Sequence, residues 1–195
     1  MLRSGGSRTT RKMQSPLHPI LAMLRGGDSR SIGRSNQVVA MVLNDPDMFG
    51  PLFSGMLGDD PVVCMRSADA AEKVTAIHPE YLVPYKEVLL RTLAGVEQPE
   101  VRWHVAPMLA RLPLSKVEQR KVVNLLVGYM NDRSSIVKTS AMQALSDLAE
   151  RDEALRPVAL RHIKELVVIG TPAMKARGRK LLDSLGRLDA FSKSK

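Results

Sequence analysis

A twelve-residue pattern recurs along the chain and constrains its fold more than any other feature. Its clearest copy, VRWHVAPMLARL, occupies Val101–Leu112, and a second copy, VKTSAMQALSDL, occupies Val137–Leu148. Both have valine first, a basic residue second, a small residue at the fifth or sixth place, and leucine at the ninth and twelfth. The pattern also fits Val63–Val74 and Met174–Leu185, and more loosely Ile32–Leu43. Self-similarity at steps of 31 to 38 residues predicts a repeat architecture.

The spacing of the shared residues is that of a helix with one buried side. The first, fifth, ninth and twelfth places fall on one face of a helix. In the clearest copy these places hold Val101, Val105, Leu109 and Leu112. The small residue at the sixth place, Ala106, allows a neighbouring helix to approach closely. We therefore expect the pattern to form a packing face.

Start and stop signals divide the chain into helices. Asp60-Pro61 and Thr171-Pro172 place a capping residue before a proline, which is tolerated at the first helical position. Ser115 and Glu118 have the spacing of a capping box. No segment alternates apolar and polar residues over a strand length. The predicted helices are 16–24, 33–44, 46–57, 61–77, 79–94, 99–112, 115–130, 134–150, 153–169 and 172–188, so the fold class is all-α.

The amino-acid composition favours a helical fold and indicates a cellular compartment. Aromatic residues make up 4% of the chain, and Ala, Leu, Val and Met supply most of the apolar content, which suits closely packed helices better than a β-core. The one cysteine, Cys64, has no partner for an intramolecular disulfide. We interpret it as an ordinary helix residue and expect a cytoplasmic location. No run reaches the roughly 20 apolar residues that a membrane span requires.

Charge is distributed unevenly around a formal net value of +9. Residues 1–30 hold six basic residues and one acidic residue, whereas residues 31–100 hold five and ten. Residues 101–195 hold eighteen and nine. We expect a flexible basic arm at 1–15, a repeat domain at 16–188 and a basic tail at 189–195. This asymmetry suggests an anionic partner without choosing among nucleic acid, acidic protein and membrane surface.

The repeated residues resemble a known family. An aspartate or proline, then valine with arginine or lysine, then small residues and two leucines is similar to the first helix of HEAT and HEAT-like repeats. Asp60-Pro61 with Val63, and Pro99 with Val101-Arg102, carry the fullest match. The resemblance covers about 32–188. It implies a right-handed α-α superhelix, a HEAT-like solenoid of about four to five helical hairpins, with the second helix of each hairpin on a concave face.

Motifs of catalysis are missing from the sequence. GxSxG, Walker A and GxGxxG do not occur, and the histidines are too scattered to form a zinc signature. These are His18, His78, His104 and His162. We interpret His104 and His162 as surface or partly packed residues. The sequence therefore predicts a non-enzymatic protein that needs no cofactor or metal.

Two features of the sequence can be compared with the sites of enzymes. Asp69 and Glu72 lie on one helix face near Arg66 and Lys73, and we interpret the four as a surface charge cluster. HEAT-like alkylpurine DNA glycosylases use a basic concave cleft with aromatic residues and an acid. The one tryptophan, Trp103, falls on a first helix, which the resemblance places on the convex side. No motif here matches that aromatic cluster or its acid, and none indicates the HEAT-related lyases.

The second helices of the hairpins therefore carry the predicted binding face. Its residues are mainly basic, with one polar residue among them: Lys86, Arg91, Arg120, Lys121, Asn124, Arg161 and Lys164. We expect a scaffold that binds an acidic or amphipathic segment of a protein partner on this concave face. The alternative is a nucleic-acid-binding protein, with or without base-repair chemistry, whose affinity would fall steeply with salt.

Overall fold

The computed structural model describes residues 17–28 and 31–193, and this part of the chain is all-helical, as predicted. The predicted arm at 1–15 lies outside the described residues. The described part holds ten α-helices and no strand. They are α1 Pro19–Ala22, α2 Ser35–Asn44, α3 Phe49–Ser54, α4 Pro61–Ile77, α5 Lys86–Arg91, α6 Pro99–Arg111, α7 Lys116–Tyr129, α8 Ser135–Arg151, α9 Arg156–Ile169 and α10 Pro172–Lys193.

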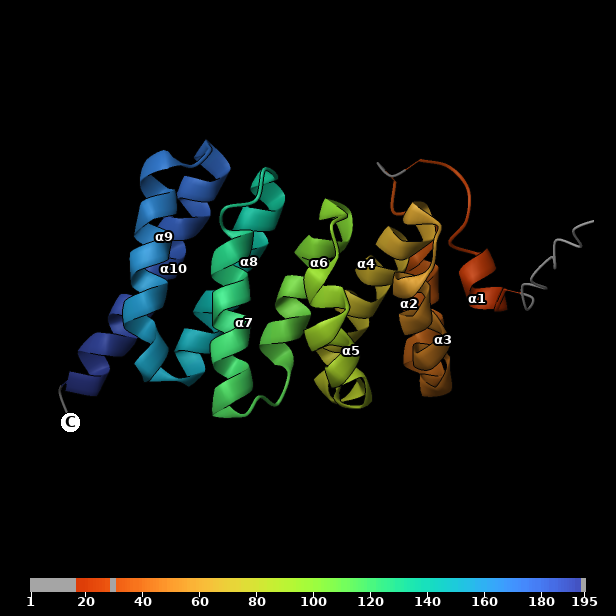
Figure 1. The fold of residues 1–195 in the computed structure, drawn as a ribbon, viewed down its shortest axis with the longest axis horizontal. Coiled ribbons are helices and arrows are strands. Elements are labelled where there is room, and N and C mark those ends of the chain that lie inside the picture. The colour runs from red at the N-terminus through yellow and green to blue at the C-terminus, as the bar shows by residue number, and fades with distance from the viewer. Residues whose placement is uncertain (1–16, 29–30, 194–195) are drawn as a thin grey trace, which may run out of the picture.

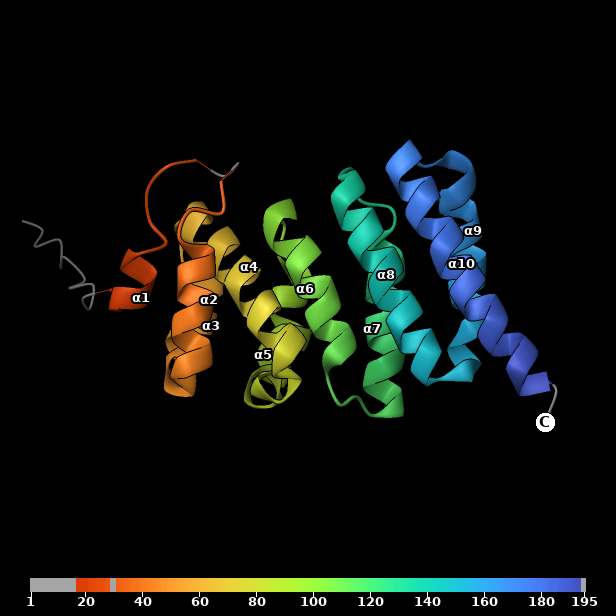
Figure 2. The ribbon, with the colours of Figure 1, turned by 180° about the vertical axis from the view of Figure 1, so that it is seen from behind.

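The helices follow one another along the long axis in two rows (Figures 1 and 2). The even-numbered row consists of α2, α4, α6, α8 and α10, and each of these helices packs against the next. The odd-numbered row consists of α3, α5, α7 and α9. Its members pack mainly on the even-numbered row: α3 on α4, α7 on α8, and α9 on both α8 and α10. The even-numbered row is thus the continuous layer of the molecule.

Caps that the sequence predicts define where the helices begin. At α4, the Asp60 carboxylate accepts hydrogen bonds from the backbone N–H groups of Val62 and Val63, at 2.9 and 3.2 Å. At α7, the Ser115 hydroxyl accepts from the N–H of Glu118 while the Glu118 carboxylate accepts from the N–H of Ser115. The predicted capping box is therefore confirmed. These bonds satisfy N–H groups that the first helical turn leaves without partners.

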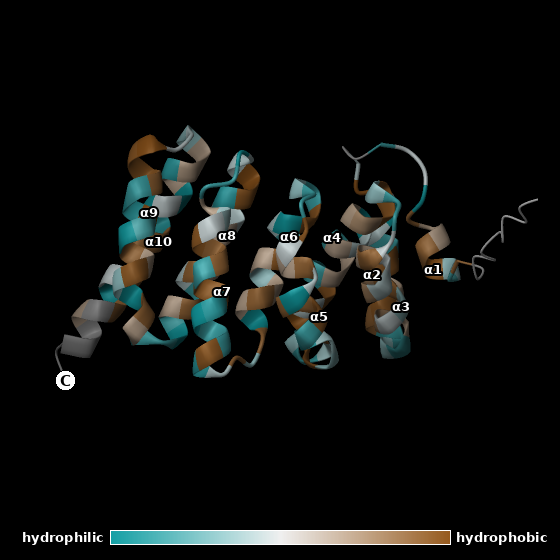
Figure 3. Ribbon diagram, viewed as in Figure 1, coloured by the Kyte–Doolittle hydropathy of each residue, from teal (hydrophilic) through white to brown (hydrophobic). Residues whose placement is uncertain are grey.

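The shared places of the repeated pattern form the core between the helices. Val101, Val105 and Leu109 are fully buried on α6, and Ala106 and Ala141 are fully buried where α6 packs on α8. Hydrophobic and hydrophilic residues accordingly alternate within the helices of the described part of the chain (Figure 3). The prediction that the pattern is a packing face is confirmed.

The odd-numbered row is more broken than the sequence predicts. The expected helix at 46–57 contains α3 between two 3₁₀ turns, Pro46–Met48 and Gly55–Leu57. The expected helix at 79–94 becomes the 3₁₀ segment Pro79–Tyr85, then α5, then another 3₁₀ turn. Proline supplies no N–H donor and fixes its own φ angle, so Pro84 favours the tighter segment before α5. The short helix expected at 16–24 contracts to α1.

Two further differences concern the chain end and the lone thiol. α10 continues to Lys193, five residues beyond the predicted end of the last helix. Cys64 lies buried in α4, where burial raises the pKa of its thiol. A raised pKa keeps the thiol protonated, which fits an ordinary helix residue. None of the described helices combines the length and apolar character that crossing a bilayer requires.

Candidate binding groove

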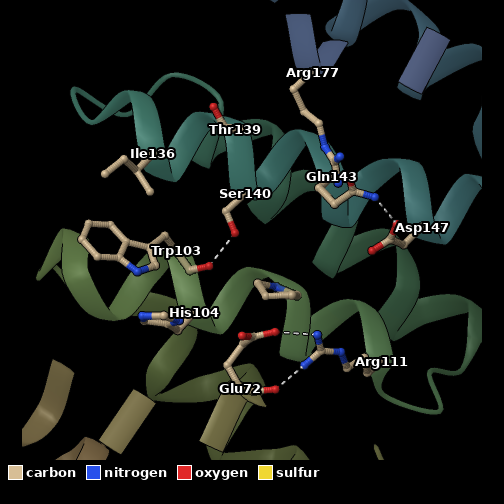
Figure 4. Close-up of a pocket in the computed structure, with 11 residues that line it drawn as sticks. Glu72, Trp103, His104, Arg111, Ile136, Thr139, Ser140, Gln143, Asp147 and Arg177 are labelled. Atoms are coloured by element: carbon tan, nitrogen blue, oxygen red, sulfur yellow. Dashed lines mark hydrogen bonds and ion pairs between the residues drawn. The ribbon is translucent and has the colours of Figure 1, made fainter. Parts of the chain in front are cut away.

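Two adjoining hollows lie on the even-numbered row, and Figure 4 shows the first of them. Their volumes are about 380 and about 570 Å³, and both are lined by Trp103, His104 and Ile136. We call the combined surface the Trp103 groove. The first hollow is also lined by Glu72, Pro107, Arg111, Thr139, Ser140, Gln143, Asp147 and Arg177. The second is also lined by Ser31, Ile32, Met65, Asp69 and Glu100.

The groove is built from fixed places of the repeated pattern. The third, fourth, seventh and eleventh places are Trp103, His104, Pro107 and Arg111 in α6, and Thr139, Ser140, Gln143 and Asp147 in α8. All eight line the first hollow. Residues that are three or four positions apart lie on the same face of a helix. This face lies next to the buried face formed by the first, fifth, ninth and twelfth places. The places at which the copies differ from one another therefore form one surface.

Trp103 and Ile136 supply the apolar part of the groove. Trp103 is half-buried on α6, and its ring meets that of His104 edge to face, with ring centroids 5.6 Å apart. Ile136 projects from α8 with 54% of its surface exposed. The Ser140 hydroxyl of α8 donates a hydrogen bond to the Trp103 carbonyl and holds the two helices together here. Figure 4 shows the indole and the Ile136 side chain on the same side of the hollow.

A buried carboxylate underlies the other side. Asp69 is 5% exposed, and its Oδ2 atom accepts hydrogen bonds from the Ser35 hydroxyl and, at 2.7 Å, from Lys73 Nζ. Its Oδ1 atom lies 3.8 Å from Nε2 of His104. Burial lowers the pKa of His104 despite the opposing effect of Asp69. A neutral imidazole thus rests beside a carboxylate that already has two partners.

Arg66 and Asp69 correct the interpretation of a surface charge cluster. Both are buried, and Arg66, through its guanidinium, makes an extensive set of hydrogen bonds at only 3% exposure of the residue. It donates hydrogen bonds to five backbone carbonyls of the segment that precedes α2: those of Leu24, Arg25, Gly26, Asp28 and Ser31. The long reach of arginine and its fan of five N–H donors suit this role. Arg66 therefore fastens the segment before α2 onto α4.

Two of the four charged residues in the first hollow, Glu72 and Arg111, form an ion pair. Glu72 Oε1 accepts a hydrogen bond from Arg111 Nη2 at 2.5 Å, and Arg111 also donates to the Glu72 carbonyl at 2.8 Å. Burial raises the pKa of Asp147, while the Gln143 amide donates to its carboxylate. Arg177 is exposed on α10 and extends toward Gln143 in Figure 4. Arg177 has no ion pair with any described residue.

The predicted binding residues lie elsewhere, together on the odd-numbered row. Lys86 on α5 pairs with Glu118 at 2.7 Å, and Arg91 pairs with Glu87 at 3.0 Å. The other five, on α7 and α9, are exposed: Arg120, Lys121, Asn124, Arg161 and Lys164. The structure thus brings the predicted set onto one row, but none of its members lines the Trp103 groove. Whether this row binds a partner stays a prediction.

Sequence reasoning missed the groove although its signal was present. The residues that the copies of the pattern share are packing residues, and they alone define the repeat. The places that differ also have helical spacing, and they carry Trp103, His104 and Arg111. Their position on a first helix was assigned to a convex side by the family resemblance. His104 is partly packed, as predicted.

Metal binding finds no support in the described residues, where no three His, Cys, Asp or Glu side chains come close enough together to hold an ion. Comparison with known proteins adds information on the fold alone. No family model matches the sequence, and no curated protein matches it. The structure is similar to the crystal structure of an engineered protein from the Northeast Structural Genomics Consortium, with a TM-score of 0.60 and 17% sequence identity. The match covers 85% of this chain and 79% of that chain.

Proposed function

We propose that this protein is a non-enzymatic, HEAT-like binding module that takes a segment of a partner protein into the Trp103 groove. The proposal keeps the class of function that the sequence predicts and places the site on the other row of helices. It includes a right-handed superhelix of four to five hairpins and, from the lone cysteine, a cytoplasmic setting.

The packing of the two rows supports the even-numbered row as the concave side. In a curved stack, helices on the inner side lie closer together than helices on the outer side. Successive even-numbered helices pack directly against each other, whereas α7 and α9 pack mainly on the even-numbered row. A partner that follows the inner side would therefore meet α4, α6 and α8 in turn.

The observation that carries the proposal is the continuity of the groove over several repeats. It extends from Ser31, before α2, to Arg177 on α10, and it combines apolar with polar side chains. A peptide needs both, because its side chains bury apolar area while its polar groups keep hydrogen-bond partners. Trp103 at the centre is of the residue type that most often dominates binding energy at interfaces.

Site-specific photo-crosslinking can test this placement. A photoreactive amino acid replaces Thr139 in the groove or, as the matched control, Asn124 on the exposed face of α7. We expect protein adducts from position 139 that outnumber those from position 124, in cells and in purified complexes. Adducts from position 124 alone would move the site to the predicted odd-numbered face and overturn the proposal.

Nucleic-acid binding is the second candidate, and one observation favours it. Arg120, Lys121 and Lys164 are exposed on α7 and α9, and none has an ion pair with a described residue. Unpaired cations in a chain of net charge +9 are the usual basis of phosphate contacts. A mobility-shift series over salt tests this: if the second candidate holds, low-salt binding is lost when all three become glutamate. Release of an alkylated base in the same assay would indicate glycosylase chemistry.

A further inference from the structure

We infer that the Trp103 groove selects a segment in which a basic residue, apolar residues and an acidic residue follow one another in that order along the groove. The inference rests on the proposed function and specifies the chemistry of the partner. It comes from the order in which charges and apolar side chains lie along the even-numbered row.

The middle of the groove is apolar and shared by both hollows. Trp103 and Ile136 line each of them, and Pro107 extends the apolar surface into the first. Ile136 is more than half exposed although it lies one residue before the buried Val137. A large apolar side chain left exposed next to a half-buried indole marks a place where a partner can bury apolar area.

The ends of the groove differ in charge. Glu72 is neutralised by Arg111, and Asp69 by Lys73. Three charged groups of the groove have no ion pair among the described residues, and one of them, the half-buried Asp147, accepts a hydrogen bond from the Gln143 amide. The other two, Glu100 and Arg177, differ in sign and in place. Glu100, half-buried in the first turn of α6, lines only the second hollow, and Arg177, exposed on α10, lines only the first.

These two groups have opposite signs and lie on opposite sides of the apolar middle. A partner therefore gains most when it presents a lysine or arginine to Glu100, apolar side chains to Trp103 and Ile136, and an aspartate or glutamate to Arg177. Complementary charges of this kind contribute more to selection and register than to total affinity. The groove thus distinguishes partners by the order of their side chains.

The same charges disfavour a nucleic acid as the occupant of this groove. A phosphate backbone repeats one negative charge at every nucleotide. It would bring these charges close to Glu100, and to the carboxylates of Glu72 and Asp147 that line the other hollow. Like charges held together in a partly dry site repel each other. A segment that carries both signs avoids this repulsion.

The sole tryptophan of the chain provides the measurement, since Trp103 lies in the groove itself. Three capped peptides without aromatic residues are titrated against the full chain while its tryptophan emission is followed. Each carries two leucines between its charged ends, which are lysine and glutamate, lysine twice, or glutamate twice. We expect the lysine–glutamate peptide to bind about tenfold more tightly than either of the others, a difference of about 1.4 kcal/mol.

Charge-reversal variants test which residue of the groove selects each charged end of the peptide. In Arg177→Glu the preference should change to the peptide with two lysines, and in Glu100→Lys to the peptide with two glutamates. Arg179→Glu and Glu97→Lys reverse exposed charges that line neither hollow, so they should keep the original order. Thermal melts of the four variants establish that each is folded before its titration is interpreted.

Three results would contradict the inference in different ways. Equal binding of all three peptides would overturn the selection by charge and leave the proposed function in place. If no peptide bound and position 139 also gave no adducts in photo-crosslinking, both the selection by charge and the proposed function would be overturned. A single-stranded oligonucleotide whose emission change is lost in Arg177→Glu and strengthened in Glu100→Lys, with both controls unchanged, would replace the peptide by a nucleic acid.

Discussion

The two rows of helices handle polar groups in opposite ways. On the even-numbered row, Arg66 and Asp69 are buried and make several hydrogen bonds each. On the odd-numbered row most charged residues, such as Arg120 and Lys164, are exposed, although Arg156 of α9 is buried. A buried polar group contributes to stability only when its partners are complete. The comparison therefore indicates that the even-numbered row holds the structure together, while the odd-numbered row mainly covers it.

The even-numbered row also carries the candidate site. Its helices bury one face of each copy of the pattern and present the adjacent face as the Trp103 groove. Packing and recognition thus belong to the same helices and to different places of one pattern. Changes at shared places should affect stability, and changes at variable places should affect binding.

The largest effect is expected from removing the Arg66 guanidinium. Arg66→Met keeps an apolar stem but leaves several carbonyls of the segment before α2 without donors. The bond to the Leu24 carbonyl is buried, and the others are partly buried. A buried group without a partner costs about 1–3 kcal/mol and the partly buried groups add a smaller cost each, so the free energy of unfolding should fall by about 3 kcal/mol. Arg120→Met on the odd-numbered row should change it by no more than about 0.5 kcal/mol. Urea titrations of both variants measure the difference. Similar unfolding midpoints would contradict the proposed difference between the two rows.

Overpacking the contact between α6 and α8 should have the next largest effect. Ala106 and Ala141 are fully buried in this region, and Ala141→Leu inserts three carbon atoms into a filled space. We expect a loss of about 1–3 kcal/mol from strain and displaced neighbours. The same change at an exposed alanine, Ala154 before α9, should be nearly neutral. Thermal melts compare the two, and an unchanged melting temperature for Ala141→Leu would show that the packing has been assigned to the wrong face.

The sequence predicted the even-numbered row better than the odd-numbered one. The starts of α4, α6 and α10 agree with their proline and capping signals to within a residue, and on the odd-numbered row the start of α7 does so too. Such signals act locally, so they can be recognised without knowledge of the tertiary structure. The 3₁₀ turns around α3 and α5 depend on which backbone N–H groups find acceptors in segments that contain several prolines and glycines. Hydrophobic periodicity does not predict those hydrogen-bond partners.

The site was harder to predict because it depends on the relation between helices. Burial of Asp69 follows from contacts with Ser35 of α2 and the position of His104 on α6. Both lie more than thirty residues away in the chain. Periodicity gave the buried face of each helix, but it could not show that the adjacent faces of α4, α6 and α8 join into one groove.

Two glycines provide a sharper comparison between close packing and open surface. A Cβ atom added to Gly178 of α10 would lie 2.4 Å from Cγ2 of Val167 on α9. At Gly128 of α7 it would meet no atom within 4 Å. Gly178→Ala should therefore destabilise the protein by about 1 kcal/mol or more, whereas Gly128→Ala should stabilise it by up to about 1 kcal/mol through helix propensity. Equal shifts in melting temperature would contradict the close approach of α9 and α10.

The smallest effects are expected from two carboxyl groups, one on each row, whose contributions should change with pH in opposite directions. Hydrogen bonds from Lys86 and from the Ser115 backbone lower the pKa of Glu118, on α7, to about 2. Its ionised form therefore stabilises the folded state above pH 4.5, the ordinary pKa of glutamate, and this contribution is lost as the pH falls toward 2. Burial raises the pKa of Asp147, on α8, above its ordinary 3.8. Its ionised form is disfavoured in the folded state, so stability decreases as the pH rises through the interval above 3.8.

The isosteric amides distinguish these two cases. Glu118→Gln should melt below the unmodified protein at pH 7, and the difference should shrink as the pH approaches 2. Asp147→Asn should melt at the same temperature or higher at pH 7, because the amide can still accept the hydrogen bond from Gln143 without carrying a buried charge. That advantage should vanish below pH 3.8. If Asp147→Asn instead lost stability at pH 7, the carboxylate would have a stabilising partner, and the candidate cations are Arg151 and Arg111, whose charges oppose the rise of its pKa.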